Sequence, residues 1–145
     1  MARRTTETSP GAAVQALARA HRGRLSTLLA PHGLHAGQDL LLLAVWASPG
    51  MRQSELARHL GVEPPTVTRM LQRMERGGLI ERRPDPQDGR AVLVHPTPRS
   101  RLLESTVRRA WTDLDELLVA LLGASDAERL ARLAATAADG LTRRD

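Results

Sequence analysis

Apolar residues recur at every third or fourth position along most of the chain, a spacing that predicts a mainly helical protein. The spacing holds over residues 12–30, 98–123 and 126–142, and it predicts an amphipathic helix over each range. Ser125 stands where a side chain can cap the start of the last helix. Residues 38–48 are almost wholly apolar, so they predict a short helix that is buried on most of its sides.

Two further helices in the middle of the chain are joined by a tight turn. Residues 53–60 have an apolar face and are followed by Gly61, a residue type that commonly ends a helix. The second helix, residues 64–76, begins with Pro64, because the first residue of a helix has no hydrogen bond for proline to lose. A pair of glycines ends it. Two helices joined by a short turn that contains glycine predict a helix-turn-helix.

The segment directly behind this motif has the composition of a β-hairpin. Residues 79–83 and 91–95 predict its two strands. The tip between them, residues 84–89, holds two prolines, two aspartates and a glycine, which all favour turns. A hairpin in this position is called a wing. The predicted fold class is therefore mainly α with a small β-wing: a winged helix-turn-helix lobe with helices on both sides of it in the sequence.

The composition of the chain excludes several classes of function. The chain has 145 residues and a formal charge of +5, and all 21 basic residues are arginine, which modestly favours a polyanionic partner. The absence of cysteine excludes disulfides, thiol chemistry and cysteine zinc sites. The longest apolar run, residues 40–47, is too short to span a bilayer, and the N-terminus lacks the apolar segment of a signal peptide. We therefore expect a cytoplasmic protein without a membrane partner.

The second helix of the motif has two faces of different chemistry at about 100° per residue. Val67, Met70, Leu71 and Met74 fall on one side and form the predicted core face. The other side and its flanks carry the residues Pro65, Thr66, Thr68, Arg69, Gln72, Arg73 and Arg76. In the major groove, arginine pairs with guanine, glutamine pairs with adenine, and threonine offers a hydroxyl or a methyl group. A solvated helix face is the alternative, but apart from Glu75 at its edge this face carries charge of one sign and lies between a tight turn and a wing.

The wing tip holds two aspartates and one arginine. Arg90 can pair with Asp85 or Asp88, and the pair would hold an arginine at the base of the tip. Arginines in wings enter the minor groove, where the negative potential of DNA is concentrated. A purely structural turn clasp is the alternative, and the two interpretations are compatible because a clasp can aim the arginine.

Residues 61–94, GVEPPTVTRMLQRMERGGLIERRPDPQDGRAVLV, resemble the MarR family of bacterial winged-helix transcription regulators. The wing pattern of that family is roughly D-x-x-D-x-R followed by an apolar strand, and Asp85, Asp88 and Arg90 occupy those places. The resemblance implies a homodimer in which the N-terminal helix and two C-terminal helices interlock, while two lobes bind a palindromic operator in double-stranded DNA. The implied regions are a disordered arm (1–11), an N-terminal dimerisation helix (12–32), a DNA-binding domain (36–97) and C-terminal dimerisation helices (98–145).

Some residues depart from the family pattern. Arg52 replaces the usual small capping residue before Gln53, so either this helix starts less firmly or Arg52 contacts phosphate. We include Arg52, Gln53 and Ser54 in the expected DNA-binding surface. Gly89 replaces a commonly charged residue of the wing structure and adds flexibility. Pro96 is expected to end the second strand early.

Members of the family often bind small aromatic acids between the dimerisation helices and the DNA-binding lobe. The candidate ligand-binding residues are His21, Arg24, His32, His35, Gln38, Trp46 and Trp111. Arginine with histidine can clamp a carboxylate, and Arg24 is expected on the helix face that enters the core, one turn beyond His21. The alternative is that both tryptophans belong to the core and that His35 caps the second helix. A metal site formed by His32, His35 and Asp39 is a further alternative, although no cysteine is available for it; no cofactor is expected.

The sequence contains no recognisable Ser-His-Asp triad and no glycine-rich phosphate loop, so we do not expect an enzyme. The predicted function is a homodimeric, sequence-specific transcription regulator that represses palindromic operators and is released by a small phenolic or aromatic acid. The alternative is an architectural or protein-interaction winged-helix protein that needs no ligand. The Thr, Arg and Gln side chains of the recognition helix favour the first function, because nonspecific binding needs only charge.

Overall fold

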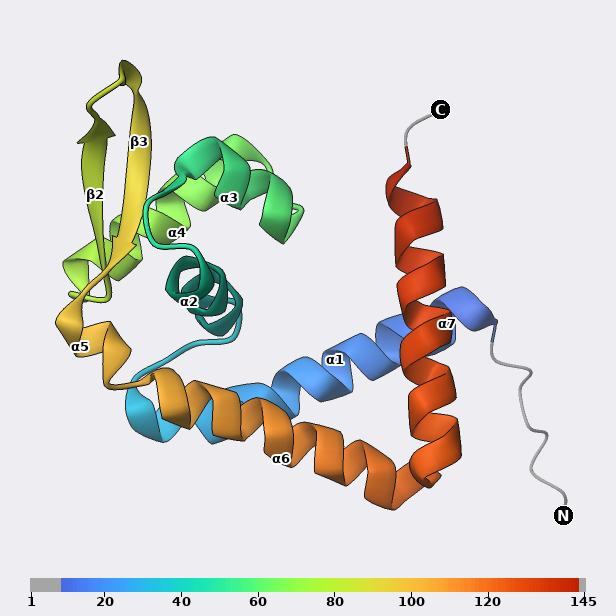
Figure 1. Ribbon diagram of the computed structural model, residues 1–145. Coiled ribbons are helices and arrows are strands. Elements are labelled where there is room, and N and C mark those ends of the chain that lie inside the picture. Colours follow the sequence, from blue (N-terminus) through green and yellow to red (C-terminus); the bar gives the residue numbers. More distant parts are fainter. Residues whose placement is uncertain (1–8, 144–145) are drawn as a thin grey trace, which may run out of the picture.

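The computed structural model describes residues 9–143 and confirms a mainly helical fold with one small antiparallel sheet (Figure 1). The helices are α1 (Pro10–Leu29), α2 (Gln38–Ala47), α3 (Gln53–Leu60), α4 (Pro64–Arg76), α5 (Pro98–Arg101), α6 (Glu104–Leu122) and α7 (Ala124–Thr142), with a short 3-10 helix η1 (Ala30–His32) after α1. The strands are β1 (Met51–Arg52), β2 (Ile80–Asp85) and β3 (Asp88–Pro96). We call residues 38–101 the winged-helix lobe and the three helices α1, α6 and α7 the helical scaffold.

Helix α1 begins two residues earlier than its apolar pattern indicated. The hydroxyl of Ser9 accepts a hydrogen bond from the backbone N–H of Ala12 at 3.2 Å and caps the helix. Pro10 follows as the first helical residue, a position that suits proline. Pro10 and Gly11 are therefore helical and not part of a disordered arm; the rest of the expected arm, residues 1–8, lies outside the described residues.

The core joins the lobe to the inner half of the scaffold. Leu25 and Leu29 are the buried residues of α1, where this helix packs against α6. Helix α2 is buried on most of its sides, as expected, and only Leu40 among its large apolar side chains is exposed. Leu71 from α4 and Val94 from β3 close the same core beneath the sheet.

The hairpin is longer and its tip shorter than the sequence indicated. The strands β2 and β3 pair from Ile80, opposite Pro96, as far as Asp85, opposite Asp88. Only two residues, 86 and 87, remain for the turn. Pro96 belongs to β3, so the expected early end is wrong; a proline at the end of a strand removes no hydrogen bond from the middle of the ladder. Strand β1 adds to the other side of β3, in the order β1-β3-β2.

The single helix expected over residues 98–123 is divided into α5 and α6. Thr97 caps α5 by accepting the N–H of Ser100 at 3.1 Å, and Arg99 donates to the carbonyl of Gly77 at 2.9 Å, so α5 is fixed to the lobe. Helix α6 instead packs along α1 of the helical scaffold. Leu102, which the periodicity placed on the buried stripe, lies at the break between them and is 81% exposed. Contacts with other elements have therefore overridden a continuous helical pattern.

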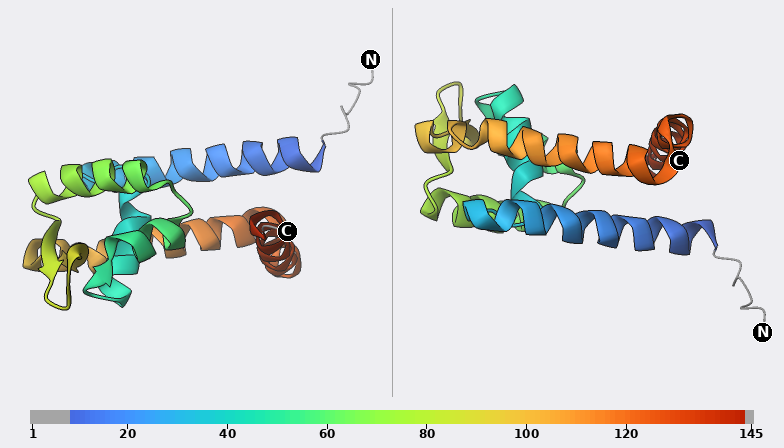
Figure 2. Two further views of the ribbon diagram at one scale, coloured as in Figure 1. Left: turned by 90° about the horizontal axis from the view of Figure 1, so that it is seen from above. Right: turned by 90° about the horizontal axis from the view of Figure 1, so that it is seen from below.

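Helix α7 begins at Ala124, directly after Gly123 ends α6. The positive φ of Gly123, 83°, turns the chain sharply between the two helices. Ser125 consequently lies inside the first turn and does not cap the helix, so that prediction is wrong. Figures 1 and 2 show α7 projecting at a steep angle from the far end of α6 and standing apart from the lobe.

Large apolar side chains remain exposed on the outer parts of the scaffold. Val14 on α1, Leu121 on α6 and Leu133 on α7 are all more than half exposed. A groove of about 790 Å³ lies between α1, α6 and α7, and its lining is almost wholly apolar. Among the described residues, no helix has the length and apolarity that a membrane span requires.

Candidate DNA-binding surface

Helices α3 and α4 are joined by a turn that their own backbone groups stabilise. Gly61 adopts the left-handed conformation, with a φ of 65°, that residues with a side chain rarely adopt. Its neighbour Val62 donates a backbone hydrogen bond to the carbonyl of Ala57 at 3.0 Å, which closes the end of α3. Pro64 and Pro65 then occupy the first two positions of α4, where no N–H is needed. The helix-turn-helix expected from the sequence is confirmed.

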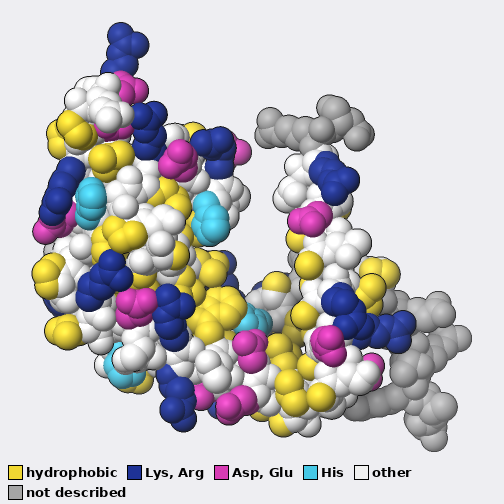
Figure 3. Space-filling view, in the orientation of Figure 1, with side chains coloured by type: hydrophobic (Ala, Val, Ile, Leu, Met, Phe, Trp, Pro, Cys, Tyr) yellow, Lys and Arg dark blue, Asp and Glu magenta, His cyan; other side chains and the backbone are white. Residues whose placement is uncertain are grey.

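Helix α4 separates its two chemistries as expected. Val67, Leu71 and Met74 are buried, and Met70 is half-buried. The opposite face exposes Pro65, Arg69, Gln72, Arg73 and Arg76, with Thr66 and Thr68 half-buried at its flanks. In the space-filling view, basic side chains are spread over the surface of the lobe and one projects at the end of the wing (Figure 3). The exposed face of α4 therefore carries side chains that can bond both to base edges and to phosphates.

Two side chains expected to contact DNA are bonded to each other. Nε2 of Gln53 donates to the hydroxyl of Thr68 at 2.8 Å, and that hydroxyl donates to the carbonyl of Pro64 at 3.0 Å. The Thr68 hydroxyl is therefore engaged within the protein, whereas Gln53 keeps a second N–H and its carbonyl oxygen. The bond fixes the start of α3 on the recognition helix, and Ser54 is exposed beside it.

An ion pair ties the wing to the start of α3. Nη2 of Arg52 lies 2.7 Å from Oδ2 of Asp85, and Oδ1 of Asp85 accepts the N–H of Gln87 at 2.9 Å. The Gln87 N–H is the main cause that holds the pKa of the Asp85 carboxyl below its ordinary value, and the Arg52 guanidinium lowers it further. The side-chain clasp expected for Arg90 is wrong, because Arg52 pairs with Asp85 and, among residues 9–143, the carboxylate of Asp88 accepts only the backbone N–H of Arg90, at 3.1 Å. The side chain of Arg90 is exposed, as is Gly89 next to it.

The start of α3 is firmer than the missing small cap suggested. Oε2 of Glu55 accepts the backbone N–H of Arg52 at 3.3 Å, which supplies half of a capping box without a serine or threonine. The Arg52 side chain is 42% exposed, so its remaining N–H groups can still meet a phosphate.

The sequence patterns did not predict a second contact, which joins the recognition helix α4 to the wing. Oε2 of Glu75 accepts from Nε and Nη2 of Arg82 at 3.0 and 2.7 Å, and Oε1 accepts the Arg82 backbone N–H at 3.2 Å. The side-chain bond to Arg82 is the largest cause that lowers the pKa of Glu75. Glu75 therefore fixes β2 on α4, and its negative charge is directed to Arg82. The sequence offered one signal, opposite charges seven residues apart across a glycine pair, but spacing alone does not show that they meet.

The candidate ligand residues are divided between different parts of the molecule. His32, His35 and Gln38 line a cleft of about 550 Å³ between the end of α1, the loop before α2, and helices α4 and α5. Oε1 of Gln38 accepts the backbone N–H of His35 at 2.9 Å in the loop before α2, and the N-cap residue of this helix is Gly37, so His35 does not cap it. Sequence reasoning missed Arg22 and Arg99 as lining residues, and it assigned Arg73 only to DNA. Among the described residues that line this cleft there is no carboxylate.

The other candidates lie outside this cleft. Trp46 is buried and donates its indole N–H to the hydroxyl of Ser100 at 3.4 Å, so it belongs to the core. Trp111 packs against His21, with ring centroids 5.3 Å apart. Arg24 is exposed, and its predicted place on the face of α1 that enters the core is wrong. That face belongs to residues 25 and 29, and residue 24 is rotated about 100° from the nearer of them.

The three residues considered for metal binding do not form a site. Asp39 is fully buried and accepts hydrogen bonds from the N–H of Gly37 and the indole of Trp111. Both His32 and His35 are exposed. Within residues 9–143, no group of three or more His, Asp or Glu side chains is arranged to hold a metal ion.

A helix-turn-helix with an exposed Arg and Gln face, followed by a wing with an exposed arginine, defines a winged-helix DNA-binding protein. Residues 34–92 match the MarR family, and an HTH-type transcriptional repressor of Mycobacterium tuberculosis is 33% identical over 114 residues, which are 79% of this chain and 74% of the repressor. The chain therefore belongs to the MarR family of transcriptional regulators, and it is a regulator and not an enzyme.

Solved structures of two transcriptional regulators have the same fold. The PcaV regulator of Streptomyces coelicolor, in complex with its natural ligand, matches with a TM-score of 0.80 and 25% identity over 96% of this chain and 98% of PcaV. The repressor CouR, bound to a 23-mer DNA duplex, matches with a TM-score of 0.82 and 28% identity over 95% and 99% of the two chains. CouR bound to p-coumaroyl-CoA matches with a TM-score of 0.82 and 27% identity over 92% of this chain and 96% of CouR.

Proposed function

We propose that the protein is a homodimeric, sequence-specific repressor of palindromic operators and that a small aromatic or phenolic acid releases it. The observation that carries this proposal is the exposed face of α4, which presents Arg69, Gln72 and Arg76 on the same lobe as Arg90 of the wing. Bidentate contacts of such side chains with base edges discriminate by about 1–3 kcal/mol each. Nonspecific binding needs cations alone, so the glutamine in the middle of this face favours sequence recognition.

The apolar groove of the scaffold supports the homodimer. Val14 and Leu17 from α1, Leu118 from α6, and Leu133 from α7 line it, and an exposed apolar area of this kind marks an interface. A second copy of the chain is the occupant that the function requires. Two recognition helices must be held about 34–36 Å apart to bind half-sites on one face of the duplex.

The cleft beside α4 supports regulation by an acidic ligand. Arg22, Arg73 and Arg99 line it from three helices, and arginine pairs bidentately with carboxylates. Arg73 belongs to the recognition helix, so an anion in the cleft competes with DNA for the same side chain. PcaV and CouR, which share the fold, were solved with the natural ligand of PcaV and with p-coumaroyl-CoA, respectively. By linkage, a ligand that weakens DNA binding is itself bound more weakly by the DNA complex, typically by about 5–150-fold.

Selection of binding sites from random duplex DNA by the purified chain tests the proposal. The expected result is one enriched palindrome, bound by two chains per duplex and preferred over scrambled DNA by at least about 10³-fold. An unenriched pool, with an affinity that depends only on salt, would instead identify an architectural winged-helix protein.

A further inference from the structure

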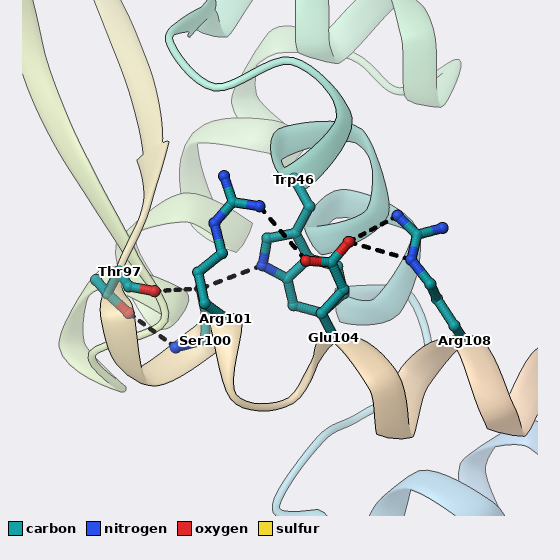
Figure 4. Close-up of polar contacts among 6 residues, drawn as sticks. All are labelled: Trp46, Thr97, Ser100, Arg101, Glu104 and Arg108. Carbon is teal, nitrogen blue, oxygen red and sulfur yellow. Dashed lines mark hydrogen bonds and ion pairs between the residues drawn. The ribbon is translucent and has the colours of Figure 1, made fainter.

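Helix α5, the last element of the winged-helix lobe, is hydrogen-bonded to the rest of the lobe. The Thr97 hydroxyl donates to the carbonyl of Gly78 at 2.6 Å, and Arg99 donates to the next carbonyl back along the chain, that of Gly77. The buried hydroxyl of Ser100 accepts the indole N–H of Trp46 from α2, as the close-up shows (Figure 4). Three side-chain hydrogen bonds therefore hold α5 on the rest of the lobe.

The connection from α5 to the scaffold is much weaker. Helix α6 begins at Glu104, and between the two helices Leu102 projects into solvent. On the outer surface, Glu104 accepts from Arg101 of α5 at 3.4 Å and from Arg108 of α6 at 2.8 Å (Figure 4). Exposed ion pairs of this kind contribute little to rigidity, because water and salt screen them. The chain connection and these ion pairs therefore fix the angle between lobe and scaffold only weakly, so that angle depends on the packing of the shared core and on polar contacts across the boundary.

A partly buried hydrogen bond crosses the same boundary from the inside. Asp39, in the first turn of α2, is fully buried, and its Oδ1 accepts the N–H of Gly37 at 2.9 Å. Its Oδ2 accepts the indole N–H of Trp111 from α6 at 3.0 Å, and the Trp111 ring packs on His21 of α1. This side-chain hydrogen bond connects α6 with α2 of the lobe, and its acceptor is a fully buried carboxylate.

A buried carboxyl oxygen that loses its donor has no water to replace it, so this bond penalises any rotation that separates α2 from α6. A ring packed on two scaffold helices cannot follow the lobe freely. We propose that Asp39 and Trp111 are positioning residues that fix the angle of the winged-helix lobe on the helical scaffold, and with it the distance between the two recognition helices of a dimer. The consequence for the dimer rests on the proposed function; the angle itself does not.

The absence of cysteine allows a direct test in the full chain. Arg58→Cys on α3 and Arg109→Cys on α6 place one spin label on the lobe and one on the scaffold, both at exposed positions. Dilution with unlabelled chain restricts pulsed dipolar spectroscopy to the distance within one chain. The expected result is a narrow distance distribution in this background and a clearly broader one after Trp111→Phe, which removes the N–H and keeps an aromatic ring beside His21.

Asp39→Leu, which has a similar shape and no hydrogen-bond acceptor, is the second variant, and it should broaden the distribution in the same way. The double variant should be no broader than the broader single variant, because both remove the same bond between Asp39 and Trp111. Trp46→Phe is the matched control: it removes the other indole N–H, inside the lobe, and should leave the distribution narrow. Narrow distributions in both Trp111→Phe and Asp39→Leu, or an equal broadening in Trp46→Phe, overturn the proposal.

The functional consequence is measured as the affinity for the selected operator and for versions of it with one base pair added or removed between the half-sites. Trp111→Phe should reduce the preference of the protein for the original spacing by about 2–10-fold, the effect of one lost hydrogen bond. An unchanged spacing preference with a broadened distance overturns the assigned role in DNA binding. A chain that sediments as a monomer contradicts the proposed function, while the distance within one chain still decides whether Asp39 and Trp111 set the angle.

Discussion

The guanidinium of Arg52 lies 2.7 Å from the carboxylate of Asp85 and ties the wing to the first helix of the helix-turn-helix. Neither residue belongs to the recognition helix, yet the pair restricts where the wing can lie beside it. Glu75 of α4 and Arg82, in the middle of β2, make a second contact of this kind. The wing is thus bonded to both helices of the helix-turn-helix, which fixes its position beside the exposed face of α4.

Asp85→Asn is expected to weaken binding to every duplex by a similar factor and to remove a pH-dependent part of the stability. The pKa of this carboxyl is lower in the folded chain than its ordinary value. Its stabilising contribution is therefore present above the ordinary pKa, about 3.9, and is lost as the pH falls through the lowered folded value. Urea unfolding of the native chain and of Asp85→Asn across about pH 3 to 7 should give curves that converge at the acid end. A difference that stays constant with pH would contradict this role.

Gln72→Ala and Arg90→Ala should affect DNA binding in different ways. Gln72 lies on the exposed face of α4, so its loss should relax the preference at one or two base pairs, by roughly 1–3 kcal/mol. Arg90 is exposed on the wing and is expected to meet backbone or minor groove, so its loss should weaken all duplexes alike. Binding to the selected operator and to its single-base variants separates the two effects. An equal loss of specificity in both variants would refute the assigned roles.

Leu118→Asp should weaken the dimer and, with it, the operator affinity. Leu118 lines the apolar groove of the scaffold, and a carboxylate there would be buried without a partner when a second chain covers it. Sedimentation at micromolar concentration should show a shift toward monomer. Leu102→Asp is the control, because Leu102 is exposed at the break before α6 and does not line the groove. A stable monomer in the native chain would refute the interface.

Arg22→Ala should abolish the response to aromatic carboxylates and leave operator binding almost intact. Arg22 lines the cationic cleft but does not belong to the DNA-binding surface. The measurement is a thermal shift with salicylate-like and larger phenolic acids, followed by release from the selected operator. Arg24→Ala is the matched control on the same helix, since Arg24 is exposed and does not line the cleft. If Arg22→Ala responds as the native chain does, or if no such acid shifts the melting temperature, the ligand site is not this cleft.

Local sequence patterns predicted the elements of the lobe but not the division of the long helix. The positions of α2, α3 and α4 follow from apolar spacing, prolines and glycines, which act within a few residues. The break between α5 and α6 depends on Arg99 reaching the carbonyl of Gly77 and on Leu102 turning to solvent. Helical periodicity cannot predict these two features, because they depend on how segments that are distant in sequence pack against residues 98–104.

The site divides in the same way. The outward and inward faces of α4 were predictable, since one helix determines them. The partners were not, because each pair joins separate elements: Gln53 with Thr68, Arg52 with Asp85, and Trp46 with Ser100. Composition could name the charged and aromatic side chains, but only the fold shows which of them are already engaged.

The packing of α1 against α6 also constrains the order of folding. These helices flank the whole lobe in sequence, whereas most contacts of α2, α3, α4 and the hairpin lie within the lobe itself. Closing the long loop of residues 30–103 is entropically costly unless a folded lobe has already drawn its ends together. During synthesis the lobe can therefore be complete while Leu25 and Leu29 of α1 still lack their α6 partners. The segment most in need of protection from aggregation on the ribosome is then the first helix, not the DNA-binding lobe.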